Sequence, residues 1–403
     1  MKCLKKYLFG LLWLTIVVTA APPSKSDYDY ENSSEEDKKP SCDDTNCQLP
    51  NCSCFGNQPK LAVMYRPQFV MLTFDDAITV ANIETYRTIA KRGTERKPVR
   101  MTFFVCHEYN DYTLAHELYS EGHEIAVHSI SHESSTELWR KATDDRWKKE
   151  MVGMRVMLDT FAGIPKKEVV GHRAPFLQTA GNTTFQVLQR EGFLYDSSMP
   201  TRNNMDPPVW PYTLDHGYAQ DCQIEPCPEG NFQGLWLVPM IQYLRRSQKP
   251  TEEDFYCSMV DACTPQPTTA KDTKEYLMEN FLRHYRSNRA PFPVFLHEAW
   301  LKEEERLQGY LDFLDEILKM EGVYTATIRD VIEYMRAPEP KKHHPQFIAR
   351  EQQPSKLTCE KKEVCSYKQP LRIMKSCTPC SKYYPWVGTP LGKRSPIDFP
   401  NME

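Results

Sequence analysis

The sequence lacks an excess of positive charge and lacks a stretch suited to crossing a membrane. Its 403 residues carry a formal charge of −4, which argues against a surface for nucleic acid or for anionic membranes. The one long apolar run, Leu8 to Val18, is short for a bilayer crossing. We therefore expect no nucleic-acid partner and no membrane insertion.

The apolar run at the N-terminus has the pattern of an export signal. Lysines precede the run, and a stretch of small residues ending at Ala20 follows it. We expect a signal peptide over residues 1–20 and a soluble, secreted protein. Residues 21–56 then hold an acidic linker without periodicity and a cluster of four cysteines. The cluster has too few cysteines for a known binding module, and we expect it to pin the N-terminus onto the body.

The cysteine count is odd once the signal peptide is removed. Of 14 cysteines, Cys3 lies in the predicted signal, which leaves thirteen. Export makes disulfides the expected state of most of them. Cys106 ends an apolar run, and we predict that it is the unpaired, buried thiol. The other twelve fall in four small clusters: Cys42, Cys47, Cys52 and Cys54; Cys222 and Cys227; Cys257 and Cys263; Cys359, Cys365, Cys377 and Cys380.

Export also makes N-glycosylation relevant. The sequence contains three Asn-x-Ser/Thr sites, at Asn32, Asn51 and Asn182. Each could carry a glycan in a eukaryotic host or remain unused.

Apolar runs of strand length alternate with helical periodicity from Phe69 onwards. The longest helical pattern runs from Glu137 to Phe161. Strands and helices in this alternation predict an α/β fold, a (β/α) barrel that is incomplete or distorted. We place this domain at residues 57–338 and a cysteine-containing tail without its own core at 339–403. The eight expected strands are 69–74, 101–105, 124–128, 169–173, 193–196, 235–238, 294–297 and 324–327.

Ionisable residues end five of these strands. In barrels of this kind the active site lies at the C-terminal ends of the strands. Chance would scatter such residues over both ends, so their convergence predicts an active site. The residues are Asp75 and Asp76, His128, Arg173, Asp196 and His297.

His128 and His132 have a spacing that places both imidazoles on one face of a helical turn. Two histidines and one carboxylate form a typical catalytic zinc set with an open position for water. The same ligands accept iron, cobalt or nickel. Alone, the spacing fits ordinary histidines as well, and the neighbouring Asp75-Asp76 pair favours the metal. His107 is an alternative ligand.

The sequence contains five short motifs whose residues and order resemble those of the polysaccharide deacetylase (NodB-homology) family. The match spans about Asn57 to Met335 and is closest to the secreted chitin deacetylases of arthropods. The family fold is a distorted (β/α) barrel. The motifs are Thr73-Phe74-Asp75-Asp76-Ala77, His128-Ser129-x-x-His132, Arg173-Ala174-Pro175-Phe176, Tyr195-Asp196-Ser197-Ser198 and Leu296-His297.

The resemblance implies a metal site and a base. Asp76, His128 and His132 would hold the metal, usually zinc. Asp75 would be the general base that takes a proton from the attacking water, and Arg173 would hold Asp75 in place. A carboxylate between a metal and an arginine stays ionised, which suits a base.

The resemblance also implies an acid and an oxyanion donor. His297 would be the general acid that protonates the leaving amine, and histidine titrates near neutral pH. The backbone N–H of Phe176 would face the developing oxyanion. Asp196 would orient or tune a histidine.

The sequence departs from the family pattern at three positions. Phe176 stands where many relatives have tyrosine, which leaves a backbone role intact. Leu237 replaces the glutamate of a Trp-Glu-Val-Pro stretch, which puts a substrate contact in doubt. Cys106 stands where relatives tend to have a small hydroxyl residue.

Three tryptophans flank the expected site. Trp210, Trp236 and Trp300 could stack on sugar rings, or they could pack in the core or in loops. Neither terminal cysteine cluster reaches the six cysteines of the usual chitin-binding module, so the enzyme would rely on its own cleft.

These observations predict a secreted, metal-dependent hydrolase that removes N-acetyl groups from chitin to give chitosan and acetate. The expected substrate is chitin or chito-oligosaccharide, and no motif names a protein partner. One alternative is a catalytically weak or inactive protein that binds a chitin matrix. Another is the same chemistry on a different acetylated polysaccharide.

Overall fold

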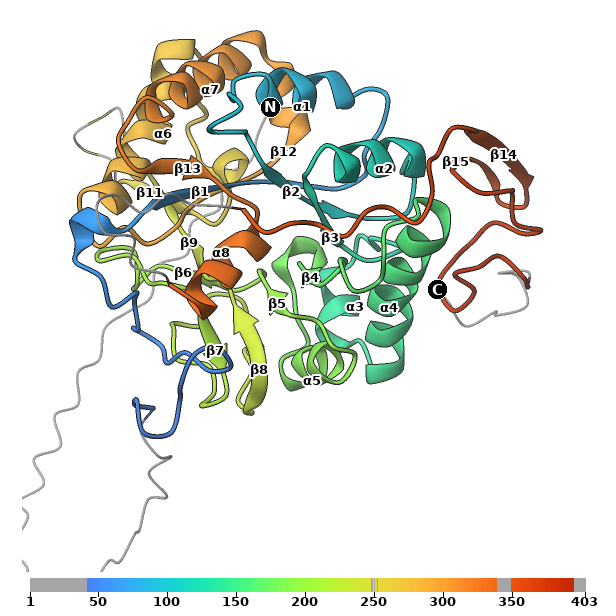
Figure 1. Ribbon diagram of the computed structural model, residues 1–403, viewed down its shortest axis with the longest axis horizontal. Coiled ribbons are helices and arrows are strands. Elements are labelled where there is room, and N and C mark those ends of the chain that lie inside the picture. Colours follow the sequence, from blue (N-terminus) through green and yellow to red (C-terminus); the bar gives the residue numbers. More distant parts are fainter. Residues whose placement is uncertain (1–41, 248, 250, 252, 339–348, 395–403) are drawn as a thin grey trace, which may run out of the picture. The chain divides into compact units, whose positions relative to one another are not determined.

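The computed structural model describes residues 42–247, 249, 251, 253–338 and 349–394 (Figure 1). The predicted signal peptide, most of the acidic linker and the Asn32 site lie outside the described residues. No helix in the described part of the chain combines the length and the apolar character that a membrane crossing needs.

A nine-stranded sheet in the order β12-β1-β2-β3-β4-β5-β8-β7 organises the fold, and β13 also pairs with β1. All of its pairings are parallel except that of β7 with β8. The end strands β12 and β7 have no pairing with each other within the described residues, so the barrel is open. This confirms the predicted distorted barrel. The strands are β1 (Gln68–Asp75), β2 (Met101–Val105), β3 (Glu124–Val127), β4 (Gly171–His172), β5 (Tyr195–Asp196), β7 (Tyr212–Leu214), β8 (Phe232–Leu237), β12 (Phe292–His297) and β13 (Val323–Thr325).

Helices follow most of the strands, as the alternation predicted, but the helix expected over 137–161 is two helices. The Thr143 side chain accepts a hydrogen bond from the Arg146 N–H and starts a new helix. Asp144 and Asp145 in its first turn favour that start through the helix dipole. The helices are α1 (Ile83–Ala90), α2 (Tyr112–Ser120), α3 (Thr136–Lys141), α4 (Asp144–Phe161), α5 (Asn182–Arg190), α6 (Ala270–Tyr285), α7 (Glu304–Ile317) and α8 (Ile328–Arg336).

Short strands and 3₁₀ turns lie outside the main sheet and the helices. A parallel pair and two antiparallel pairs of strands lie outside the main sheet. They are β6 (Pro200–Thr201) with β9 (Met240–Ile241), β10 (Tyr243–Arg245) with β11 (Phe255–Cys257), and β14 (Glu363–Lys368) with β15 (Leu371–Ser376). The 3₁₀ turns are η1 (Val63–Tyr65), η2 (Pro175–Leu177), η3 (Val260–Ala262) and η4 (Glu298–Lys302).

The two faces of the sheet bury different sets of side chains. On β1, Val70, Leu72 and Phe74 belong to the large cluster that the helices share. Phe69 and Met71 belong to a second cluster on the inner face of the barrel. Because side chains alternate along a strand, Asp75 falls on this inner face. Other strands contribute Phe104, Ala126, Tyr195 and Trp236 to the inner cluster.

Every disulfide in the part of the chain that the structure describes joins cysteines of one cluster. Cys106 is unpaired and buried, as predicted. The six bonds are Cys42–Cys54, Cys47–Cys52, Cys222–Cys227, Cys257–Cys263, Cys359–Cys377 and Cys365–Cys380.

The N-terminal cluster is held on the body, as expected, but by non-covalent contacts, because both of its disulfides in the described residues are internal to the cluster. The cluster docks through Ser53, whose N–H donates to Thr213 Oγ1 at 3.0 Å. The Thr213 N–H donates back to the Ser53 carbonyl at 2.9 Å. Phe55 packs edge-on against Tyr212.

The C-terminal segment 349–394 packs onto the barrel. The Cys377 N–H donates to the Phe161 carbonyl at 2.8 Å, and the Arg372 guanidinium pairs with Glu108. Met374 and Tyr384 are part of the large core cluster. The segment therefore shares the core of the barrel and, as expected, has no separate core.

Candidate active site

The structure brings six predicted site residues to the C-terminal ends of the strands. Asp75 ends β1 and pairs in register with His297, the last residue of β12. His128 follows β3, and Arg173 follows β4. Asp76 and His132 complete the group. Parallel neighbours end at one edge of the sheet, which explains why residues far apart in sequence meet here.

Asp75 is a buried carboxylate held by a buried arginine. Arg173 Nη1 donates to Asp75 Oδ1 at 2.5 Å and to Thr73 Oγ1 at 3.0 Å. Burial alone would raise the pKa of Asp75, but the neighbouring positive charges, that of Arg173 foremost, hold that pKa below its usual value. Asp75 is therefore ionised, with Oδ1 occupied by the arginine.

Asp76, His128 and His132 form a set able to hold a metal ion. One ligand atom from each lies within 4.8 Å of the others. His128 Nδ1 is 2.8 Å from the Arg173 carbonyl, so Nδ1–H donates there and Nε2 remains for a metal. Burial lowers the pKa of His128 to about 4, which keeps the imidazole in the neutral form that metals bind. These donors fit a zinc ion.

The two histidines are not on a helical turn, which corrects the prediction. Residues 128–132 form a loop in which Ser129 has φ 80° and His132 has φ 43°. Asp76 has φ 80° and Phe176 has φ 55°. Non-glycine residues rarely adopt this region, and such strain tends to gather at functional sites.

His107 does not belong to the group of Asp76, His128 and His132 that could hold a metal ion in the described residues. Its Nδ1 lies 2.7 Å from the Tyr112 hydroxyl, and its ring packs on Tyr384 at 4.8 Å between centroids.

Asp261 is a site residue that the sequence reasoning missed. Its Oδ2 lies 2.7 Å from His297 Nδ1 and also accepts the His297 backbone N–H at 3.0 Å. Burial would lower the pKa of His297, but Asp261, Asp75 and Asp76 outweigh it and raise that pKa to about 9. Asp261 lies between the bonded Cys257 and Cys263. An acidic residue inside so short a disulfide loop was the only signal in the sequence.

Asp196 lies on the helix-facing side of the sheet. Its Oδ1 is 2.7 Å from His172 Nδ1 and accepts the Ser198 hydroxyl at 2.6 Å. Ser198 Oγ in turn accepts the Ala174 N–H at 2.8 Å. Asp196 thus contacts a histidine that is outside the metal set, and it supports the segment after Arg173 from behind. A part for Asp196 in the chemistry stays a prediction.

The three tryptophans are covered, which favours packing in the core or in loops over stacking on sugar rings. Trp210 and Trp236 are 2% and 1% exposed within the inner cluster. Trp300 is 5% exposed and donates from Nε1 to Gln266 Oε1 at 2.6 Å. Phe176, by contrast, is 45% exposed, with its ring 5.0 Å from that of His132. Leu237 is buried in the large core cluster on the helix-facing side.

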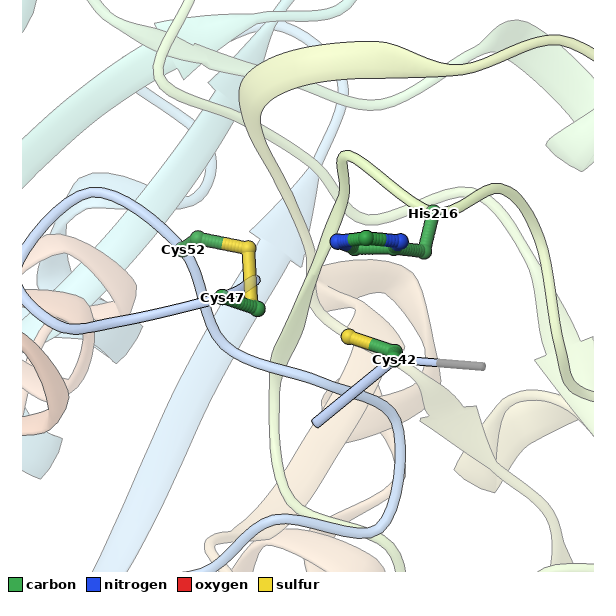
Figure 2. A group of neighbouring side chains, drawn as sticks. All are labelled: Cys42, Cys47, Cys52 and His216. Carbon is green, nitrogen blue, oxygen red and sulfur yellow. A yellow bond between two sulfur atoms is a disulfide. The ribbon is translucent and has the colours of Figure 1, made fainter. Parts of the chain in front are cut away.

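A second group of metal-type ligands lies at the N-terminal cluster. Figure 2 shows the His216 ring beside the Cys47–Cys52 disulfide and Cys42. Cys42 is bonded to Cys54. Because these sulfur atoms are all in disulfides, the group offers no thiolate to a metal. The group of His116, Cys359 and Cys377 is blocked in the same way.

Comparison with known proteins agrees with the motifs. The family model for polysaccharide deacetylase matches residues 63–195. Chitin deacetylase 8 of Bombyx mori is 38% identical over 364 residues, which cover 87% of this chain and 93% of that protein. Chitin deacetylase 1 of Bombyx mori is 35% identical over 391 residues, which cover 90% of this chain and 71% of that protein.

Among solved structures, a Mycobacterium smegmatis protein assigned as a polysaccharide deacetylase has a TM-score of 0.47 at 20% identity. The match covers 76% of this chain and 100% of that one. The identity to the two Bombyx proteins extends over most of this chain and includes the barrel and its site. The chain therefore belongs to the polysaccharide deacetylase family of hydrolases.

Proposed function

We propose that this protein is a secreted, metal-dependent enzyme that removes N-acetyl groups from chitin and releases acetate. The observation that carries the proposal is the grouping of an ionised carboxylate, a metal set and a protonated histidine at one edge of the sheet. The similarity to two chitin deacetylases supports chitin as the substrate.

Asp76, His128 and His132 would hold the metal, with zinc the best fit to the donors. A metal bound there supplies Lewis acidity, which lowers the pKa of water towards ~7 and polarises a carbonyl. Groups of the protein itself carry out the proton transfers and stabilise the oxyanion.

Asp75 acts as the general base. Arg173 occupies Oδ1, so Oδ2 is the oxygen that accepts a proton from the attacking water. Arg173 is fully buried, and its Nε donates to the Ser197 carbonyl at 2.8 Å, so it holds the carboxylate in one orientation. The water oxygen bonds to the acetyl carbon while the Phe176 N–H stabilises the developing oxyanion.

His297 acts as the general acid. Asp261 holds Nδ1, which leaves the Nε2 proton for the leaving nitrogen. With a pKa of about 9 the imidazole is protonated at neutral pH. As the C–N bond breaks, this proton converts the nitrogen into an amine, and the acyl group leaves as acetate.

The disulfides support secretion. Twelve cysteines form six bonds, which are stable in an oxidising compartment. The exposed Asn51 is the sequon best placed for a glycan.

The test is acetate release from chitin oligomers of several lengths, with and without a chelator. We expect release that the chelator abolishes and that added zinc restores. Binding to chitin with no acetate release would favour the inactive matrix protein instead. Acetate release only from other acetylated polysaccharides would show that chitin is not the substrate, while the proposed chemistry would stand.

A further inference from the structure

A single buried carboxylate holds the loop that joins His128 to His132. Glu150 Oε2 accepts the backbone N–H of Ile130 at 2.9 Å and that of Ser131 at 3.0 Å. Glu150 Oε1 accepts the Ser131 hydroxyl at 2.7 Å. The glutamate therefore fixes two consecutive peptide groups between the two histidines.

The charge of Glu150 is compensated in place. Its side chain is 0% exposed, and a buried carboxylate is costly unless it is paired and hydrogen-bonded. Arg146, one turn earlier on α4, lies 2.7 Å from Oε1 through Nη2. The same Nη2 donates to the Ser131 hydroxyl at 3.3 Å. Charge-assisted bonds of this kind are the stronger class, so the loop is firmly held.

A third position on α4 receives the loop. A Cβ at Gly153 would lie 2.7 Å from Ile130 Cδ1, so the glycine lets Ile130 pack against the helix backbone. Residues 146, 150 and 153 share one face of a helix. That face both binds the peptide groups of the loop and receives its apolar side chain.

The loop needs such support because its backbone is strained. Ser129 and His132 both have positive φ. Such conformations persist only where the surroundings over-determine them. The Ser129 hydroxyl accepts the His132 N–H at 3.1 Å but leaves the Ile130 and Ser131 N–H groups to Glu150.

We propose that Glu150 is a positioning residue of the metal centre. By fixing the Ile130 and Ser131 peptides it sets the separation and orientation of the two imidazoles before a metal binds. This inference rests on the proposed metal site and concerns affinity for the ion, so it can be tested without an activity assay.

The experiment compares zinc affinity and stability of purified variants. Glu150→Gln keeps the size of the side chain but removes its charge and replaces one acceptor by a donor. We expect the zinc Kd, measured by competition with a chelator, to rise about 10- to 100-fold, as for other residues that orient metal ligands. Lys149→Gln is the matched control, because Lys149 lies on the same helix and pairs with Asp145 at the surface.

The melting temperature of the metal-free variants separates positioning from general stability. A Glu150→Gln protein that melts earlier but keeps the wild-type zinc Kd would overturn the proposal. If that variant does not fold, Glu150→Asp keeps the charge and withdraws the carboxylate from the Ile130 and Ser131 N–H groups, and an unchanged zinc Kd in that variant would overturn the proposal equally. If wild type and His128→Ala bind zinc alike, the proposed metal site fails instead.

Discussion

Asp75 and Asp76 are adjacent in sequence and differ in their surroundings. The side chain of Asp75 is 2% exposed and paired with Arg173, whereas that of Asp76 is 48% exposed. The backbone turns at Asp76, which has φ 80°. The turn directs the Asp75 carboxylate inward to Arg173 and the Asp76 carboxylate towards His132, 3.5 Å away.

Substitution should separate these two roles. Asp75→Asn should keep the metal and reduce acetate release by ~10²–10⁴-fold, the usual range for loss of a general base. Asp76→Asn should lower metal content and activity together. Metal analysis and acetate assay on the same preparations check this, with His297→Ala as a variant that keeps its metal. If the Asp75→Asn protein loses its metal and the Asp76→Asn protein keeps its metal, the two roles are reversed.

The pair of His297 and Asp261 predicts the alkaline limit of activity. The general acid must be protonated, and the pKa of His297 is about 9. Activity should therefore fall as the pH rises through about 9. Asp261→Asn removes a negative charge and should lower that pKa, which moves the decline to lower pH. The pH dependence of kcat/KM measures this, and an unmoved alkaline limb would show that Asp261 does not tune His297.

At the scale of elements, the alternation of strand residues predicts much of the site. Asp75 shares the inner face of β1 with Phe69 and Met71. Tyr195 of β5 lies in the same inner cluster, so the next residue, Asp196, must face the helices. The alternation of side chains along a strand therefore predicts that Asp196 and Leu237 do not lie on the inner face.

Other features needed contacts between distant segments and could not be read from local pattern. Asp261 meets His297 because a disulfide loop folds back over β12, 36 residues away in sequence. Glu150 looks like one more polar residue of an amphipathic helix until the loop after β3 is placed against it. The break between α3 and α4 depends on the Thr143 cap, which outweighs an otherwise continuous helical pattern.

Burial predicts opposite effects for two aromatic side chains. Trp236→Ala should empty the inner face of the barrel and lower the free energy of unfolding by about 3–5 kcal/mol. Phe176→Ala removes an exposed ring beside His132 and should leave stability almost unchanged while raising KM about 3- to 10-fold. Denaturant unfolding and steady-state kinetics on both variants check this. A Trp236→Ala protein that keeps its stability but has a raised KM would instead indicate that the Trp236 ring contacts the substrate.

At the scale of the whole molecule, the thiol count is a direct test of the fold. Burial, with a smaller effect of the Asp76 charge, raises the pKa of the Cys106 thiol well above its usual value. Native protein should therefore resist alkylation, and unreduced but unfolded protein should take up one label, at Cys106. Mass spectrometry measures the label, and Cys106→Ser should take up none. A label on any other cysteine would contradict the disulfide pairing.

The pairing of β1 also has a consequence for how the chain is made. β1 emerges early, yet its partners β12 and β13 follow more than two hundred residues later. At typical synthesis rates the apolar edge of β1 stays unpaired for ~10–40 s before β12 emerges. The cysteines of each disulfide, by contrast, are at most 18 residues apart and emerge almost together. Each disulfide can thus form locally as the chain emerges, while the unfinished barrel needs protection from aggregation until its last strands arrive.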